Sequence, residues 1–139
     1  MARRVYVDSS FYIAYLHSDD TLHRLALDLL HSLRSEAGLS YTTSDGVLAE
    51  VLAFFARRGH RLRDLAVNLA RDVMTAPDIE VVEQRRPLLL QALDLYAARG
   101  DKSYSLTDCS SMLICRARGI TDVLTHDSDF EQEGFSILL

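Results

Sequence analysis

The chain has 139 residues, of which 48% are hydrophobic, and its formal net charge is −5. A chain of this size can bury a core without disulfides or a structural metal, so we expect one domain over residues 1–139. The negative charge argues against a basic nucleic-acid-binding coat over the whole surface, although a local basic rim around an acidic centre stays compatible with it.

Short β-rich runs alternate with segments that repeat apolar residues at helical spacing. In chain order we predict a strand at 4–8, helices at 11–17 and 22–35, a strand at 39–43, helices at 44–59 and 62–74, a strand at 79–82, helices at 87–99 and 107–119, and strands at 123–125 and 135–139. This alternation predicts an α/β fold with a central, mainly parallel sheet of about five strands and helices on both faces. The last strand is expected at the sheet edge.

Several features predict a soluble protein of the reducing cytoplasm. No apolar run approaches the roughly 18 residues of a membrane span. The N-terminus reaches an acid at Asp8, where a signal peptide would need its apolar region. Cys109 and Cys115 lie on one apolar helix without metal-ligand spacing, and this favours buried, reduced thiols.

Four acids lie where this topology can bring them together. Asp8 ends the first strand, Asp127 follows the fourth strand, Asp108 begins a helix, and Glu50 sits among apolar residues in the helix after the second strand. Carboxyl ends of parallel strands meet at one edge of the sheet, which is where such folds carry their functional crevice. Taken singly, these acids fit a helix cap, a turn, a first-turn residue or a solvent-exposed position equally well.

A gathering of four carboxylates implies a cation. Two like charges about 4 Å apart repel by roughly 4 kcal/mol at an effective dielectric of 20. An all-oxygen site suits Mg²⁺ or Mn²⁺, which can activate water and stabilise a phosphodiester under attack. Zinc is disfavoured because the five histidines form no HxxxH pair near an acid. His126, beside Asp127, is expected in a packing or outer-sphere role.

The same residues carry a resemblance to a known family. The stretches that carry it are residues 7–11 around Asp8, 48–52 around Glu50, 105–111 around Asp108 and 124–135 around Asp127. In order and spacing they resemble a PIN domain, and within that family the VapC-type toxins. The resemblance implies a three-layer α/β/α fold and a Mg²⁺- or Mn²⁺-dependent endoribonuclease that hydrolyses RNA without a covalent intermediate.

The resemblance also implies roles and partners. Asp8, Glu50, Asp108 and Asp127 match the four acids of the family and are expected as catalytic and metal-binding residues. Asp129 falls where relatives vary and is left as an outer-sphere candidate. Family members are commonly homodimers, and the toxins pair with a small antitoxin whose tail blocks the acidic groove.

Two further groups of side chains are candidates for supporting roles. The hydroxyls of Ser9 and Thr125 could position carboxylates or substrate. The arginines at positions 57, 58, 61 and 63 cluster between two predicted helices and are candidates for phosphate contacts. A solvated loop or a dimer contact explains that cluster equally well.

Other functions remain open at this point. A housekeeping RNA-processing PIN nuclease cannot be separated from a toxin, and a non-catalytic PIN-like module would bind RNA or protein without cleavage. A signalling receiver would need an adjacent acid pair after the first strand, whereas Asp8 is followed by Ser9 and Ser10. The sequence does not name the RNA target, decide between RNA and DNA, or say whether an antitoxin exists.

Overall fold

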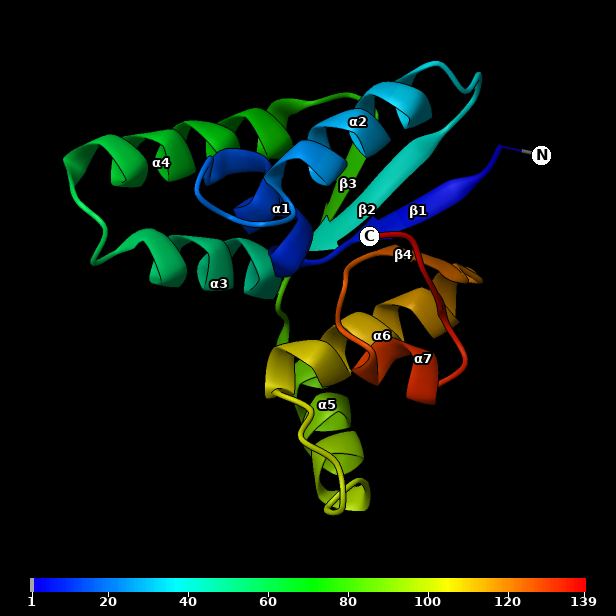
Figure 1. The fold of residues 1–139 in the computed structure, drawn as a ribbon. Helices are drawn as coiled ribbons and strands as arrows, with labels where there is room; N and C mark the ends of the chain where they lie inside the picture. The colour runs from blue at the N-terminus through cyan, green and yellow to red at the C-terminus, as the bar shows by residue number, and fades with distance from the viewer. Residues whose placement is uncertain (1) are drawn as a thin grey trace.

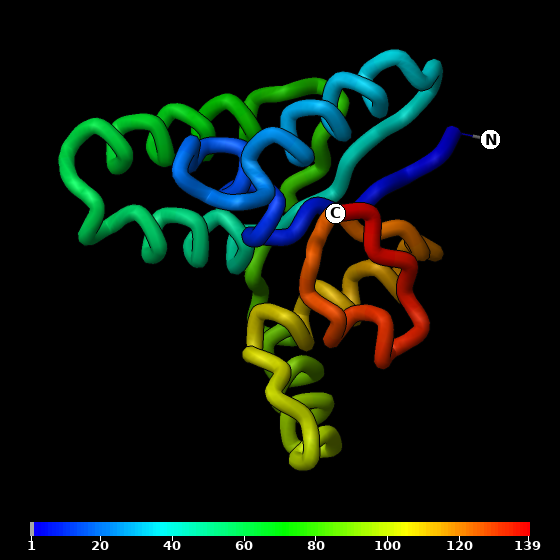
Figure 2. The backbone as a smooth tube through the Cα atoms, in the orientation of Figure 1, coloured from blue at the N-terminus to red at the C-terminus, as the bar shows by residue number. Residues whose placement is uncertain are grey.

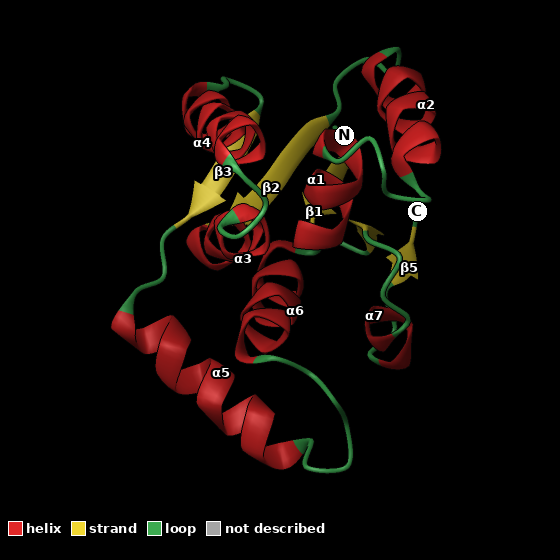
Figure 3. Ribbon diagram, turned by 60° about the vertical axis from the view of Figure 1, so that its left-hand side comes forward, coloured by secondary structure: helices red, strands yellow, loops and turns green. Residues whose placement is uncertain are grey.

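The computed structural model describes residues 2–139, and its strands and helices alternate along the chain (Figure 1). The elements are β1 (Arg4–Val7), α1 (Ser9–Leu16), α2 (His23–Arg34), β2 (Ser40–Ser44), α3 (Asp45–Phe55), α4 (His60–Thr75), β3 (Ile79–Val82), α5 (Arg86–Ala98), α6 (Leu106–Arg118), β4 (Asp122–Leu124), α7 (Asp129–Gln132) and β5 (Ser136–Ile137). Helices α1, α2 and α4 lie on one side of the sheet, and α5 and α6 lie on the other (Figures 1 and 3). The predicted three-layer α/β/α fold is therefore confirmed.

The sheet has the strand order β3-β2-β1-β4-β5, and every pairing is parallel. Its central strand β1 pairs through Tyr6 with Thr42 of β2 on one side and with Val123 of β4 on the other. The chain leaves β1 toward β2 and later returns to the opposite side of β1 as β4. The strand order thus reverses at the β1–β4 boundary, and a crevice forms outside the carboxyl ends of such strands.

Alternation along β1 divides the core between the two faces of the sheet. Val7 faces the helices α1, α2 and α4, where it lines a cavity with Tyr12 and Leu30. Tyr6 points the other way and reaches Ser111 of α6. Both faces are covered, as a parallel sheet requires, and Figure 2 shows α5 extending away from the sheet beyond α6.

Most predicted boundaries agree with the structure to within two residues. The first strand ends at Val7 rather than Asp8, so that Asp8 lies at the N-cap of α1. The last strand is at the sheet edge as predicted, but it covers Ser136–Ile137 instead of 135–139. Phe135 is buried against Phe130, with ring centroids 6.2 Å apart. Its side chain therefore packs in the core, and the strand starts only at the next residue.

Two of the general predictions can be compared directly with the fold. Cys109 and Cys115 are both free and buried, as expected for structural thiols. Across residues 2–139, none of the helices combines the length and the apolar character that crossing a membrane requires.

Candidate active site

Asp8 emerges from the end of β1 into a buried position at the head of α1. Its side chain is 3% exposed, and although Asp8 occupies the N-cap position of α1, this side chain makes no capping hydrogen bond to the helix. One carboxylate oxygen, Oδ2, accepts a hydrogen bond of 2.9 Å from the Thr125 hydroxyl. The other oxygen, Oδ1, is buried and has no hydrogen-bond partner among residues 2–139. An unpartnered buried carboxylate oxygen is costly unless a cation or a proton accompanies it.

Thr125 connects the two strand ends that carry acids. It is fully buried, and its hydroxyl oxygen accepts from the backbone N–H of Asp127 at 3.1 Å while donating to Asp8. Because a threonine hydroxyl has one proton, the Ser10 hydroxyl at 2.9 Å must donate to it. Thr125 therefore fixes the start of the β4–α7 turn against β1.

Glu50 reaches the same region from the middle of α3. The Ser9 hydroxyl donates to Glu50 Oε1 at 3.0 Å, and the side chain is half-buried. Burial raises the pKa of Glu50, and the carboxylates of Asp108 and Asp127 raise it further. The expectation that the Ser9 and Thr125 hydroxyls position carboxylates is confirmed by these contacts.

Asp108 lies in the first turn of α6, where it has a structural role as well. The Ser105 hydroxyl accepts from the Asp108 N–H at 3.0 Å, and Asp108 Oδ2 accepts from the Ser105 N–H at 2.9 Å, which together form a capping box. Burial raises the pKa of Asp108, with the carboxylates of Asp127 and Asp129 adding to the effect. The capping box therefore fixes the orientation of the Asp108 side chain at the start of α6.

Asp127 lies in the turn between β4 and α7, and Asp129 is the first residue of α7. The Asp129 N–H donates to Asp127 Oδ1 at 2.9 Å, so the turn folds the two acids back toward each other. One oxygen each of Asp108, Asp127 and Asp129 lies within 4.8 Å of the others. The sequence indicates only an outer-sphere role for Asp129, whereas its carboxylate belongs to this compact group. The sequence signal for this role of Asp129 is the pair of acids at Asp127 and Asp129, separated by one residue after a predicted strand.

The acids predicted from the sequence lie along one open cleft of about 550 Å³. The residues that line it are Asp8, Ser9, Ser10, Glu50, Ser105, Asp108, His126, Asp127 and Ser128. Asp8 and Glu50 line this cleft without joining the compact three-carboxylate group found within the described chain. Figure 3 shows the starts of α1 and α6 and the body of α3 meeting at this edge of the sheet.

The electrostatics of the cleft favour a bound cation. Burial raises the pKa of Asp8 to about 7, and the nearby Asp108 and Glu50 carboxylates contribute in the same direction. Burial and the Asp127 carboxylate also raise the pKa of Asp129. A divalent ion would offset both the repulsion and the desolvation. The donors are all oxygens and include the unpartnered Asp8 Oδ1, so the residues fit Mg²⁺ or Mn²⁺.

The arginine cluster divides into two pairs at the turn between α3 and α4. Arg58 lies over the Phe54 ring, 3.6 Å from its centroid, and donates to the Phe54 carbonyl, while Arg63 donates to the Ala56 carbonyl at 2.7 Å. These two arginines close the C-terminal end of α3. Arg57 and Arg61 are exposed, and their side chains form no hydrogen bond or ion pair within residues 2–139.

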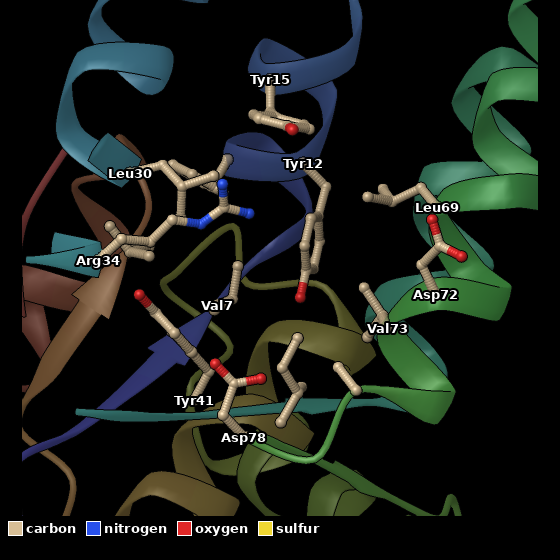
Figure 4. A pocket seen from close by; sticks show the side chains of 14 residues that line it. Val7, Tyr12, Tyr15, Leu30, Arg34, Tyr41, Leu69, Asp72, Val73 and Asp78 are labelled. Carbon is tan, nitrogen blue, oxygen red and sulfur yellow. The ribbon is translucent and has the colours of Figure 1, made fainter. Parts of the chain in front are cut away.

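A second cavity, of about 250 Å³, lies between the sheet and the helices α1, α2 and α4 (Figure 4). Its walls are mainly apolar and include Tyr12, Leu30 and Tyr41. The hydroxyls of both tyrosines are buried and find no hydrogen-bond partner in the part of the chain that the structure describes. None of the acids of the cleft lines this cavity, so it has no part in the carboxylate chemistry.

Comparisons with known proteins agree with this geometry. A family model described as the PIN domain matches residues 5–135. The "23S rRNA-specific endonuclease VapC20" of Mycobacterium tuberculosis is 29% identical over 132 residues, which cover 94% of this chain and 95% of the relative.

Solved structures are similar as well. The crystal structure of VapC20 from M. tuberculosis, described as a "Sarcin-Ricin loop cleaving toxin", has a TM-score of 0.81 and 28% identity, covering 95% of this chain and 96% of that chain. FitAcB from Neisseria gonorrhoeae has a TM-score of 0.65 at 14% identity, covering 97% and 96% of the two chains. The latter similarity concerns the fold alone.

Proposed function

This chain belongs to the PIN domain family, and from that premise we propose that it is a metal-dependent endoribonuclease that hydrolyses RNA phosphodiester bonds. The observation that carries the proposal is the position of Asp8, Glu50, Asp108 and Asp127 along one cleft at the carboxyl ends of β1 and β4. Its relative in M. tuberculosis is named a 23S rRNA-specific endonuclease, and this supports RNA over DNA as the substrate.

Asp108, Asp127 and Asp129 would hold a Mg²⁺ or Mn²⁺ ion, with Asp8 contributing its unpartnered oxygen. When bound, such an ion supplies Lewis acidity, which makes water nucleophilic near neutral pH and stabilises charge on the phosphate. Thr125 keeps Asp8 oriented toward the cleft by donating to its other oxygen. The chain thus provides a rigid, all-oxygen set of ligands.

Glu50 is suited to handling the proton of the attacking water. Ser9 holds one of its oxygens at 3.0 Å, and burial raises its pKa toward the neutral range in which a general base works best. Glu50 would orient the water and accept its proton when the geometry of the bound substrate allows it.

Hydrolysis of ribosomal RNA by the purified protein is the direct test. We expect cleavage at discrete positions in Mg²⁺, mapped by sequencing the RNA ends, and its loss in EDTA. Asp108→Asn should lower the rate by at least about 100-fold, because metal-ion catalysis contributes several kcal/mol. Asp94→Asn changes an exposed acid on α5 and should leave cleavage unaltered. Cleavage that survives both EDTA and Asp108→Asn would contradict the proposal.

We also propose that the chain is the toxin component of a toxin–antitoxin pair, acting in the cytoplasm, with a small antitoxin as partner and a homodimer as its assembly. The support is the M. tuberculosis relative, whose structure is described as that of a "Sarcin-Ricin loop cleaving toxin". Expression of the wild-type chain should arrest growth, whereas expression of Asp108→Asn should not. Equal growth of both strains would argue for a housekeeping nuclease.

Arg57 and Arg61 are proposed to contact RNA phosphates, since Arg58 and Arg63 are engaged with backbone carbonyls. Replacing both with Ala in an Asp108→Asn background should lower the slope of log Kd against log salt by about 1.4, which corresponds to two phosphate contacts to single-stranded RNA. The matched control is the double change of Arg24 and Arg71, two exposed arginines on α2 and α4. An unchanged salt slope for Arg57→Ala/Arg61→Ala would remove these residues from the RNA interface.

A further inference from the structure

The hydroxyl of Tyr6 forms a buried polar junction directly beneath the cleft. Tyr6 lies in β1, two residues before Asp8, and is fully buried. Its hydroxyl donates to Ser44 Oγ at 3.2 Å and lies 2.7 Å from Ser111 Oγ. Because a phenol has a single proton, Ser111 donates to the Tyr6 oxygen. Burial raises the pKa of Tyr6, so the hydroxyl keeps its proton.

Each serine either caps or lies within a helix that carries one of the acids. Ser44 is the N-cap of α3 and accepts from the Val47 N–H at 3.2 Å. Glu50 follows on the same helix, about 9 Å along its axis. Ser111 lies three residues after Asp108 on α6, and positions i and i+3 share one face of a helix. One hydroxyl on the Asp8 strand is therefore bonded to both acid-bearing helices.

The helices α3 and α6 come very close to each other at this point. A Cβ atom on Gly46, in the first turn of α3, would lie 3.3 Å from Thr107 Cγ2 in the first turn of α6. The next atoms that this Cβ would meet are Thr107 Oγ1 at 3.5 Å and Gln84 Oε1 at 3.7 Å, so the close approach of the two helices depends on a glycine at position 46. Within residues 2–139, the side-chain hydrogen bonds between the start of α3 and α6 pass through the Tyr6 hydroxyl.

We infer that Tyr6 is a positioning residue for the cleft: its hydroxyl sets the spacing of α3, α6 and β1. It thereby fixes the separation of Asp8 and Asp108, which are proposed to bind the cation, and places Glu50, which is proposed to handle the proton, relative to them. This inference rests on the proposed metal-dependent cleavage. A phenylalanine would fill the same space, but it would leave Ser111 without its acceptor and Ser44 without its buried donor. Since a displacement of about 1 Å can cost on the order of 100-fold in rate, a small shift between the helices would be visible in the chemistry.

The test compares Tyr6→Phe with Tyr41→Phe. Tyr41 lies on the neighbouring strand β2 and lines the cavity of Figure 4. Its hydroxyl is buried and makes no hydrogen bond among the described residues. Tyr41→Phe therefore removes the same hydroxyl oxygen as Tyr6→Phe but breaks no hydrogen bond. For Tyr6→Phe we expect the Kd for Mn²⁺, measured by calorimetry, to rise at least about tenfold, as for other groups that orient metal ligands. The kcat for RNA cleavage should fall by a similar factor with KM for RNA unchanged. Tyr41→Phe should keep both values within about twofold.

Ser111→Ala tests separately the hydrogen bond between Tyr6 and α6, because it removes the Ser111 hydroxyl and leaves the Tyr6–Ser44 hydrogen bond in place. It should also raise the Mn²⁺ Kd, with less effect than Tyr6→Phe. If Tyr6→Phe melts at a lower temperature but keeps the wild-type Mn²⁺ Kd and kcat, Tyr6 is a packing residue only and the inference is overturned. A wild-type protein that neither binds Mn²⁺ nor cleaves RNA would instead overturn the proposed function, so the two failures are distinguishable.

Discussion

Asp8→Asn is expected to abolish Mg²⁺-dependent RNA cleavage and, at the same time, to make the metal-free protein more stable at pH 8. The activity should fall by at least about 100-fold, since the variant loses a carboxylate proposed to bind the ion. The gain in stability has a different cause. Asp8 is 3% exposed, and one of its oxygens has no hydrogen-bond partner among the described residues, so a negative charge there destabilises the fold when no cation is present.

The pH dependence of this effect has a defined sign. Asp8 in the folded protein binds a proton up to a pKa of about 7, whereas the ordinary value is 3.8. The folded state therefore binds more protons than the unfolded chain in this range, and the free energy of unfolding of the metal-free wild type falls as the pH rises from about 4 to about 7. The shift corresponds to roughly 4 kcal/mol. A newly buried amide costs about 1–3 kcal/mol, so we expect a net gain of about 1–3 kcal/mol for the variant.

Urea unfolding in EDTA at pH 4.5 and pH 8 measures this difference. The variant should exceed the wild type only at pH 8, and Mn²⁺ at 100 times its Kd should stabilise the wild type by about 2.7 kcal/mol and the variant far less. Asp64→Asn, which changes an exposed acid on α4, serves as the matched control and should alter neither curve. A metal-free Asp8→Asn protein that is less stable than the wild type at both pH values would mean that Asp8 is paired in solution.

The fold could be predicted from local patterns because these patterns agree with the tertiary structure. The strands at residues 79–82 and 123–125 are short β-branched runs that follow Pro77 and Gly119, and both were predicted to within one residue. The exact ends could not be predicted, since they depend on partners distant in sequence. Residues 135–139 look like one strand, yet Phe135 is used in the packing against Phe130.

The candidate site could be predicted only in part. Strand ends and helix starts indicated Asp8, Asp108 and Asp127, because the parallel topology brings such positions to one edge. Asp129 could not be assigned, since its position depends on a turn closed by the Asp127 carboxylate itself. Tyr6 reads in the sequence as an ordinary strand residue, and its two serine partners are 38 and 105 residues away in the chain.

Glu133 is a second residue that the sequence does not single out, and it holds the turn that carries Asp127 and Asp129. Its side chain is 6% exposed and accepts from Arg99 at 3.0 Å, Arg116 at 2.7 Å and Tyr104 at 2.9 Å. It thereby connects the end of α7 to α6 and to the segment that leads into Ser105, the cap partner of Asp108. We expect Glu133→Gln to lower the free energy of unfolding at pH 7 by about 2 kcal/mol, because it leaves two arginines without their shared carboxylate.

The acid limb of the stability curve distinguishes this charge effect from a loss of packing. Arg99 above all, then Arg116 and Tyr104, lower the pKa of Glu133 to about 2 from an ordinary value of 4.5. A lowered pKa gives stability that is present above about pH 5 and is lost as the pH falls through about 2. The side chains of Arg99 and Arg116 are 36% and 43% exposed, so solvent screening keeps the effect on stability well below the full value of the pKa shift.

Urea unfolding measures this difference. The free energies of unfolding of the wild type and of Glu133→Gln should differ at pH 7 and converge near pH 2. The control Glu131→Gln changes an exposed acid on α7 and should follow the wild type at both pH values. If the difference persists unchanged at pH 2, the Glu133 side chain stabilises the fold by its shape rather than by its charge, and the proposed charge effect is wrong.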